Sequence, residues 1–220
     1  MSAFGHLVID IEAASIADAE QYLEPASAPA NYKDEAKIAA YIAEANQQAL
    51  SKCALDPDLA RIVALGMCDP QTGVVDVLTA NSEASEGVLL TTLWERLRGQ
   101  VTVIGYNVTG YDLPVLMRRS LYLGVTAPQI QIDKYRHPTV IDLMQVLSYN
   151  GAMKYRGLAF YLKRFGIPHT DTTTGADIGA LVSTGDWAAI EAHCRADVEA
   201  TVALARRIGV IQAQPEMAAR

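Results

Sequence analysis

The sequence GHLVIDIEAAS, residues 5–15, contains an apolar run that leads directly into two carboxylates. The run Leu7–Ile9 predicts a buried strand, and Asp10 and Glu12 follow on it with one residue between them. Since successive side chains of a strand point to opposite faces, Asp10 and Glu12 share one face of the sheet. Two like charges at this spacing repel each other, and burial makes their ionisation still more costly. The stretch therefore predicts a strand whose polar face needs a cationic partner.

Composition and charge limit the class of protein. The chain has 220 residues, of which 50% are hydrophobic, and its formal net charge is −7. The length fits one globular domain, and the acidity argues against a protein that coats duplex nucleic acid, because such proteins neutralise phosphates with basic residues. Bound metal ions would reverse the local field, so an enzyme that acts at a strand end stays compatible with the charge. Three scattered cysteines and the lack of a secretory signal or a membrane-length apolar run predict a cytoplasmic protein without disulfides.

Hydrophobic periodicity predicts a mixed α/β arrangement that begins with an antiparallel meander. We expect a hairpin of two strands after the first one, because the breaker-rich sequence DPQTG separates two apolar runs. The expected strands lie at 5–12, 61–67, 74–80 and 101–106, with a short strand or helix entry at 139–144, and the expected helices lie at about 34–51, 86–98, 110–124, 155–166 and 186–209.

The expected domain organisation is one domain over residues 1–210 and a flexible tail over 211–220. A polar, alanine-rich insertion at 13–58 separates the first two strands and contains the helix at about 34–51. Because the insertion begins where Asp10 and Glu12 end, a helical flap over them is one hypothesis. The alternative is a packed helix without a functional role.

A third carboxylate belongs to the sequence IGYNVTGYDLPVLMRR, residues 104–119, in which Asp112 opens a helix directly after a strand and a turn. A carboxylate at this position is also a good helix cap, which is the purely structural alternative. Asn107 ends the strand, and we weigh it as either a turn former or a group that positions substrate. Tyr111 is either a core residue or a surface on which a terminal base stacks.

The fourth carboxylate lies on the last expected helix. Asp197 falls on an apolar stripe between Cys194 and Thr201, and a lone aspartate on a buried face needs a partner. His193 lies four residues before Asp197 and therefore close to the same face. A salt bridge from Asp197 to an arginine of the same helix is the alternative, as is a histidine that only packs.

Convergence of these four carboxylates would require divalent cations, because oxygen ligands with negative charge are what such ions bind. A pair of cations at roughly 3.5–4 Å is the known device for hydrolysis of phosphodiesters. An alternative is a glycosidase that uses Asp10 and Glu12 as its acid and base, although the chain holds few aromatic residues for a sugar-stacking cleft.

The sequences IDIE, GYNVTGYDLPVL and HCRADVEAT, in this order, resemble the three exonuclease motifs of the DEDD (DnaQ-like) 3′–5′ exonuclease superfamily. The resemblance is greatest to the proofreading domain of family B DNA polymerases and to its stand-alone phage and bacterial relatives. It implies an α/β ribonuclease H-like fold with a mixed five-stranded sheet flanked by helices. By position it makes Asp10, Glu12, Asp112 and Asp197 the ligands of two divalent cations, Mg²⁺ or Mn²⁺.

The implied activity is hydrolysis of the terminal phosphodiester of single-stranded DNA, which releases nucleoside 5′-monophosphates from the 3′ end, in replication, repair or nucleotide recycling by phage. His193 would orient the attacking water, although one subfamily has tyrosine at this four-residue spacing and the other has histidine five residues before the aspartate. We expect no net shift in the pKa of His193, because cations and carboxylates act on it in opposite senses. Asn107 and Tyr111 are expected to bind substrate. The expected partners are the 3′ end of single-stranded DNA and replication or repair proteins. An exoribonuclease of the same fold and a catalytically weak nucleic-acid-binding module are the competing hypotheses.

Overall fold

The computed structural model describes residues 5–99, 101–132 and 139–212. Its strands and helices, in chain order, are β1 (Gly5–Ser15), η1 (Ala19–Tyr22), α1 (Glu35–Lys52), η2 (Cys53–Leu55), β2 (Ala60–Cys68), β3 (Val75–Thr79), α2 (Glu83–Arg96), β4 (Val101–Gly105), α3 (Asp112–Tyr122), β5 (Val140–Asp142), α4 (Leu143–Ser148), α5 (Leu158–Phe165), α6 (Ile178–Thr184) and α7 (Trp187–Arg207).

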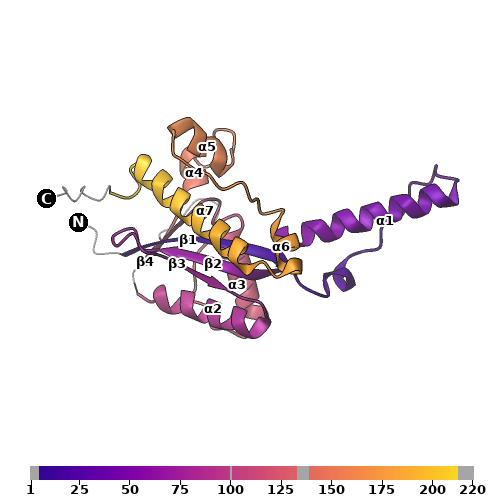
Figure 1. Cartoon of the computed structure of the whole chain (residues 1–220), viewed down its shortest axis with the longest axis horizontal. Coiled ribbons are helices and arrows are strands. Elements are labelled where there is room, and N and C mark those ends of the chain that lie inside the picture. The colour runs from indigo at the N-terminus through magenta and orange to yellow at the C-terminus, as the bar shows by residue number, and fades with distance from the viewer. Residues whose placement is uncertain (1–4, 100, 133–138, 213–220) are drawn as a thin grey trace.

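The five strands form one mixed sheet in the order β3-β2-β1-β4-β5, with β1 at its centre. β1 pairs antiparallel with β2, and β2 pairs antiparallel with β3, so the chain begins with the expected meander. β4 and β5 then add in parallel on the other side of β1. Helix α7 lies across one face of the sheet, and α2 and α3 lie on the opposite face (Figure 1).

Strand β1 is covered on both faces, and its alternating side chains belong to two different cores. Leu7, Ile9 and Ile11 pack against the buried leucines of α2 and α3. Val8 faces the other way and packs with residues of α5 and α7. Because Asp10 and Glu12 share the face of Val8, their side chains lie under α7, as the period of two requires.

A glycine lets α7 approach the sheet closely. Gly66 of β2 pairs with Asp10 of β1, and a Cβ atom at Gly66 would lie 2.4 Å from Val198 Cγ2 and 3.1 Å from Cys194 Sγ. Any side chain at this position would therefore push the helix outward. The absence of a Cβ atom on Gly66 brings the polar residues of α7 within reach of the β1 carboxylates.

Most of the expected elements are present, with shifted ends. β1 extends to Ser15, beyond the expected end at 12, so the segment between the first two strands is shorter than the predicted insertion at 13–58. The stretch at 139–144 is both a strand and a helix entry, because Asp142 ends β5 and its side chain caps α4. Helix α6 was not predicted, and the sequence 213–220 of the expected tail lies outside the described residues.

Helix α1 projects beyond the end of the sheet, with its N-terminal end far from the other elements and its C-terminal end leading back to β2 (Figure 1). Within the described residues none of its own side chains is buried, although Asp34 caps its first turn through the backbone N–H groups of Ala36 and Lys37. In this arrangement α1 does not cover the carboxylates of β1. The structure therefore gives no support to the hypothesis of a flap.

Candidate active site

The β1 carboxylates lie where the central strand changes its register. Asp10 pairs with Gly66 and Glu12 with Ala64, and a bulge between Glu12 and Ala13 interrupts the ladder with β2. Bulges re-aim side chains and are common beside functional sites. Glu12 is buried, whereas Asp10 is surrounded by protein atoms but keeps some accessible surface. The strand therefore presents two carboxylates beneath α7.

Asp112 is the first residue of α3, as expected, but it is not the helix cap. Tyr111 occupies the cap position and makes no capping hydrogen bond through its side chain. The Asp112 Oδ1 atom instead accepts a hydrogen bond from the backbone N–H of Ile11 at 3.2 Å. Ile11 lies between Asp10 and Glu12, so this contact fixes Asp112 beside the strand that carries the other two carboxylates.

Helix α7 supplies Asp197 and His193 from the face that it turns toward the sheet. The expected apolar stripe is confirmed, since Ile190, Cys194, Thr201 and Leu204 are fully buried and Ile208 packs against the core. His193 Nε2 lies 3.4 Å from Glu12 Oε1, and the His193 side chain is only 5% exposed.

The arginine partners weighed for Asp197 are engaged elsewhere. Arg195 donates to the carbonyl of Val75 and to Glu191, and Arg206 donates to the carbonyl of Pro70. The Asp197 side chain is 26% exposed and faces His169, with 3.7 Å between His169 Nε2 and Asp197 Oδ1. A salt bridge to either arginine is therefore the wrong explanation for this carboxylate.

Burial and neighbouring charges raise the pKa values of all four carboxylates. Burial raises the pKa of Asp10 well above its ordinary value, and Asp112, Glu12 and Asp197 raise it further. Burial also raises the pKa of Glu12 to about 8 and that of Asp112 to about 7. Raised pKa values of this kind mean that ionisation of these carboxylates destabilises the folded protein unless a positive charge lies beside them. The structure thus brings together the four residues that the sequence identified.

In the metal-free protein the pKa of His193 is raised, whereas the expectation of no net shift included bound cations and stays a prediction. Burial acts to lower it, but the nearby carboxylate of Glu12, the hydrogen bond with Asp171 and the charge of Asp197 together outweigh burial. The expectation included the opposing charge of cations, whereas the protein alone presents only the carboxylates. Carboxylates surround the ring on two sides and favour its charged form.

Two further residues reach this site from the segment between α5 and α6, and sequence reasoning missed both. Asp171 forms a hydrogen bond with His193 Nδ1, and His169 faces Asp197. Although burial acts to raise it, the pKa of Asp171 is lowered, because His193 and the backbone N–H of Thr173 bond to the carboxylate. The segment has no periodicity, and only its packing on α7 identifies these residues.

Asn107 and Tyr111 have structural roles in the described residues. Asn107 adopts a left-handed φ of 58°, and its carbonyl accepts hydrogen bonds from the N–H groups of Gly110 and Tyr111, so it forms the turn between β4 and α3. Tyr111 packs against the core, and its hydroxyl donates to the carbonyl of Ala54. Binding of substrate by these two residues stays a prediction.

Asp142 anchors the same turn. It is 3% exposed and accepts hydrogen bonds from the backbone N–H groups of Asn107 and Thr109, both at 3.0 Å. It also accepts from the N–H of Met144 at 2.9 Å. These bonds hold the end of β4 against β5 and thereby set the position from which α3 starts.

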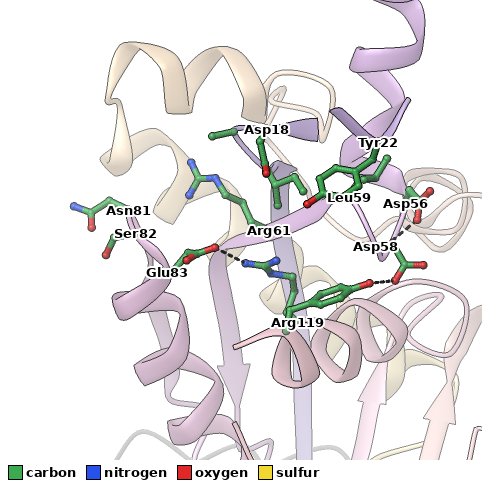
Figure 2. A pocket seen from close by; sticks show the side chains of 13 residues that line it. Asp18, Tyr22, Asp56, Asp58, Leu59, Arg61, Asn81, Ser82, Glu83 and Arg119 are labelled. Carbon is green, nitrogen blue, oxygen red and sulfur yellow. Dashed lines mark hydrogen bonds and ion pairs between the residues drawn. The ribbon is translucent and has the colours of Figure 1, made fainter. Parts of the chain in front are cut away.

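A separate cavity of about 730 Å³ lies where β1 ends, beside the first turn of α2 and one side of α3 (Figure 2). Its carboxylates are largely engaged within the protein. Asp58 pairs with Arg118 at 2.8 Å and accepts from the hydroxyl of Tyr122, and Glu83 faces Arg119. The residues that line it include none of the four converging carboxylates, so this cavity is distinct from the candidate active site.

The donor atoms of the site fit divalent cations. Ligand atoms of Glu12, His193 and Asp197 lie within 4.8 Å of one another, and the same holds for His169, Asp171 and Asp197. Carboxylate oxygens are the ligands that Mg²⁺ and Mn²⁺ prefer, and cations would relieve the repulsion that raises the carboxylate pKa values. The structure therefore contains acidic clusters of the kind that bind divalent metals.

Solved structures with a similar fold include DNA-processing proteins. The family B DNA polymerase from the hyperthermophilic archaeon Pyrobaculum calidifontis is 17% identical, with a TM-score of 0.60 over 93% of this chain and 24% of the polymerase. Exonuclease I in complex with the inhibitor BCBP is 15% identical, with a TM-score of 0.50 over 96% of this chain and 42% of exonuclease I. The chain thus spans less than half of either protein. These likenesses identify the mixed sheet and its flanking helices as a ribonuclease H-like fold.

Sequence comparison assigns the family. Comparison with curated proteins finds no match. Among the described helices, none combines the length and apolar character needed to cross a membrane. A family model described as a predicted 3′–5′ exonuclease related to the exonuclease domain of PolB matches residues 55–218, which include Asp112, His193 and Asp197. The chain therefore belongs to this family of 3′–5′ exonucleases related to the exonuclease domain of PolB.

Proposed function

We propose that the chain is a metal-dependent 3′–5′ exodeoxyribonuclease that hydrolyses the terminal phosphodiester of single-stranded DNA and releases nucleoside 5′-monophosphates. The observation that carries the proposal is the convergence of Asp10, Glu12, Asp112 and Asp197 from β1, α3 and α7. Without cations, such a group of buried acids destabilises the fold, so a binding role explains why they are placed together.

Two divalent cations, Mg²⁺ or Mn²⁺, held by these carboxylates would offset their charge, polarise the phosphate and favour both deprotonation of the water and departure of the 3′ oxygen. Asp10 and Glu12 would contribute oxygen ligands from the rigid central strand. The Oδ1 atom of Asp112 accepts a hydrogen bond from the Ile11 N–H, which fixes the orientation of this carboxylate toward the strand. Asp197 approaches from α7 and closes the group from the opposite side.

His193 supplies a group for proton transfer. Its Nε2 atom faces Glu12 and hence the carboxylate cluster, where a phosphate and an attacking water would lie. In the proposed step, which requires the neutral ring and therefore bound cations that offset the nearby carboxylate charge, the water O–H bond breaks as the new P–O bond forms, and Nε2 takes the proton. The P–O3′ bond breaks, and the 3′ oxygen leaves with a proton from solvent. General base assistance of this kind contributes about 10²–10⁴-fold to the rate.

The test is a time course on one oligonucleotide labelled at either its 5′ or its 3′ end, with Mg²⁺, Mn²⁺ or EDTA. A 3′–5′ exonuclease shortens the 5′-labelled strand stepwise and releases labelled mononucleotide from the 3′-labelled strand at once, whereas EDTA stops both reactions. Asp10→Asn and Asp197→Asn should abolish the activity. Glu191→Gln is the matched control, because Glu191 lies on the outer face of α7 and pairs only with Arg195 among the described contacts.

The same time course on RNA of matched sequence decides the substrate. Faster degradation of RNA would replace the deoxyribonuclease by the exoribonuclease, because a contact with the 2′-hydroxyl is what separates the two substrates. Binding of the strand without metal-dependent cleavage would identify the accessory module. Activity near that of the wild type in either aspartate variant would refute the proposed site.

A further inference from the structure

Both nitrogen atoms of the His193 ring have a carboxylate beside them, and the two carboxylates come from different parts of the chain. Nδ1 forms a hydrogen bond with Asp171 Oδ2, and Nε2 lies 3.4 Å from Glu12 Oε1. Glu12 belongs to β1 and to the proposed metal-binding group. Asp171 belongs to the irregular segment between α5 and α6, so it approaches the ring from a different element than Glu12.

The position of Asp171 is itself fixed. Its other oxygen, Oδ1, accepts a hydrogen bond from the backbone N–H of Thr173 at 3.1 Å, and its side chain is 19% exposed. Since an ionised carboxylate only accepts hydrogen bonds, the proton of the bond between Asp171 and His193 belongs to Nδ1. The hydrogen bond at one ring nitrogen sets which tautomer the neutral ring adopts, and thus leaves the lone pair of that ring on Nε2.

We propose that Asp171 is a positioning residue, which holds His193 with a proton on Nδ1 and with Nε2 directed at the carboxylate cluster. The proposal deepens the proposed function and rests on it for its catalytic consequence. Asp171 acts through His193 and is not one of the four proposed metal ligands. Without a partner on another element, the ring of a histidine on α7 could rotate about its side-chain bonds. The hydrogen bond with Asp171, which lies outside α7, fixes the plane and the tautomer of the ring. This arrangement supplies a water-orienting group at the spacing where one subfamily has tyrosine.

The first test does not depend on nuclease activity. Nitrogen-15 NMR of the metal-free protein reports which ring nitrogens of each histidine carry protons, and His193→Ala identifies the signals of His193. Between pH 6 and 9 we expect Nδ1 of His193 to carry a proton. In Asp171→Asn the neutral form with the proton on Nε2 should become populated. A neutral wild-type ring with its proton on Nε2 would overturn the proposal, whether or not the chain is a nuclease.

The second test compares kinetic constants. Asp171→Asn should lower kcat at least about tenfold and leave KM within about twofold, because the substrate still binds but proton transfer is misdirected. The matched control is Asp177→Asn in the same segment, since Asp177 bonds to the N–H and hydroxyl of Thr174 rather than to the ring. This control should retain the wild-type kcat.

A double variant separates positioning from a general structural effect. If Asp171 acts through His193, the variant Asp171→Asn/His193→Ala should have a kcat within about twofold of His193→Ala alone, because the residues act as a unit. Multiplication of the two losses, or a rise in KM equal to the fall in kcat, would overturn the positioning role. An inactive wild type with the expected NMR result would instead reject the proposed function and leave the geometry of the ring intact.

Discussion

Replacement of Asp112 by asparagine should stabilise the metal-free protein while it abolishes activity. Asparagine has nearly the same shape, and its side-chain oxygen can still accept the hydrogen bond that Ile11 N–H donates at 3.2 Å. What is lost is the negative charge, which is buried at 4% exposure and repels its neighbour Asp10. A residue selected for binding of cations rather than for stability should behave in this way.

The pKa of Asp112 gives the magnitude. Burial raises this pKa from 3.8 to about 7, which corresponds to about 4 kcal/mol of disfavoured ionisation at a pH above both values. The amide must still be desolvated and forms a weaker hydrogen bond than the carboxylate, so we expect a net gain of about 1–3 kcal/mol at pH 8. For a chain of this size, the melting temperature should rise by about 2–4 °C for each kcal/mol.

The assay is thermal and urea unfolding in EDTA at pH 8 and pH 5, for the wild type and for Asp112→Asn. At pH 5 the gain should shrink, because the folded wild type already holds a proton on Asp112 and avoids most of the charge. Glu24→Gln, which removes an equal charge from an exposed position, controls for net charge. Saturating Mn²⁺ should stabilise the wild type and the control more than Asp112→Asn.

Two results would refute this reasoning. A lower melting temperature for Asp112→Asn at pH 8 in EDTA would mean that the carboxylate stabilises the fold, as a structural residue does. An equal gain at both pH values would mean that the charge of Asp112 does not cause the difference. Either result would remove the electrostatic argument that the four carboxylates need cations.

Gly66→Ala should separate α7 from β1, because the new Cβ atom would lie 2.4 Å from Val198 Cγ2. We expect the free energy of unfolding in urea to fall by about 1–3 kcal/mol and kcat to fall as well. Unchanged stability and kcat would show that the close approach is not required. Arg119→Met should destabilise the fold by about 3–5 kcal/mol in the same assay, since Arg119 forms two hydrogen bonds of 2.8 Å with the buried Glu86, and a loss below about 1 kcal/mol would contradict the pairing. The metal-free wild type should lose stability as the pH rises from about 5 to 8, because folded Glu12, with its pKa raised from 4.5 to about 8, holds a proton that the unfolded chain releases. Excess Mn²⁺ should reduce this loss. A stability that rises over the same pH range would contradict the raised pKa of folded Glu12.

The sequence by itself predicted those features that depend on local spacing. Alternation along residues 5–15 placed Asp10 and Glu12 on one face, and the stripe of α7 placed Asp197 on its buried side. The turn before Asp112 predicted the start of α3. These predictions succeed because the periods of strand and helix are fixed by the backbone and do not depend on distant residues.

Other features of the same site depend on contacts between distant segments. The role of Asp171 follows from the passage of an irregular segment beside α7, and that of Gly66 follows from the distance between a helix and a strand. Neither has a periodic signature, and α6 was missed because its seven residues are too few to establish one. The position of α1 beyond the end of the sheet likewise has no signal in its own sequence pattern (Figure 1). The sequence thus determined which carboxylates face the core, and the tertiary structure decided which groups orient them, because side-chain periodicity is local whereas contacts between elements are set by packing of the whole chain.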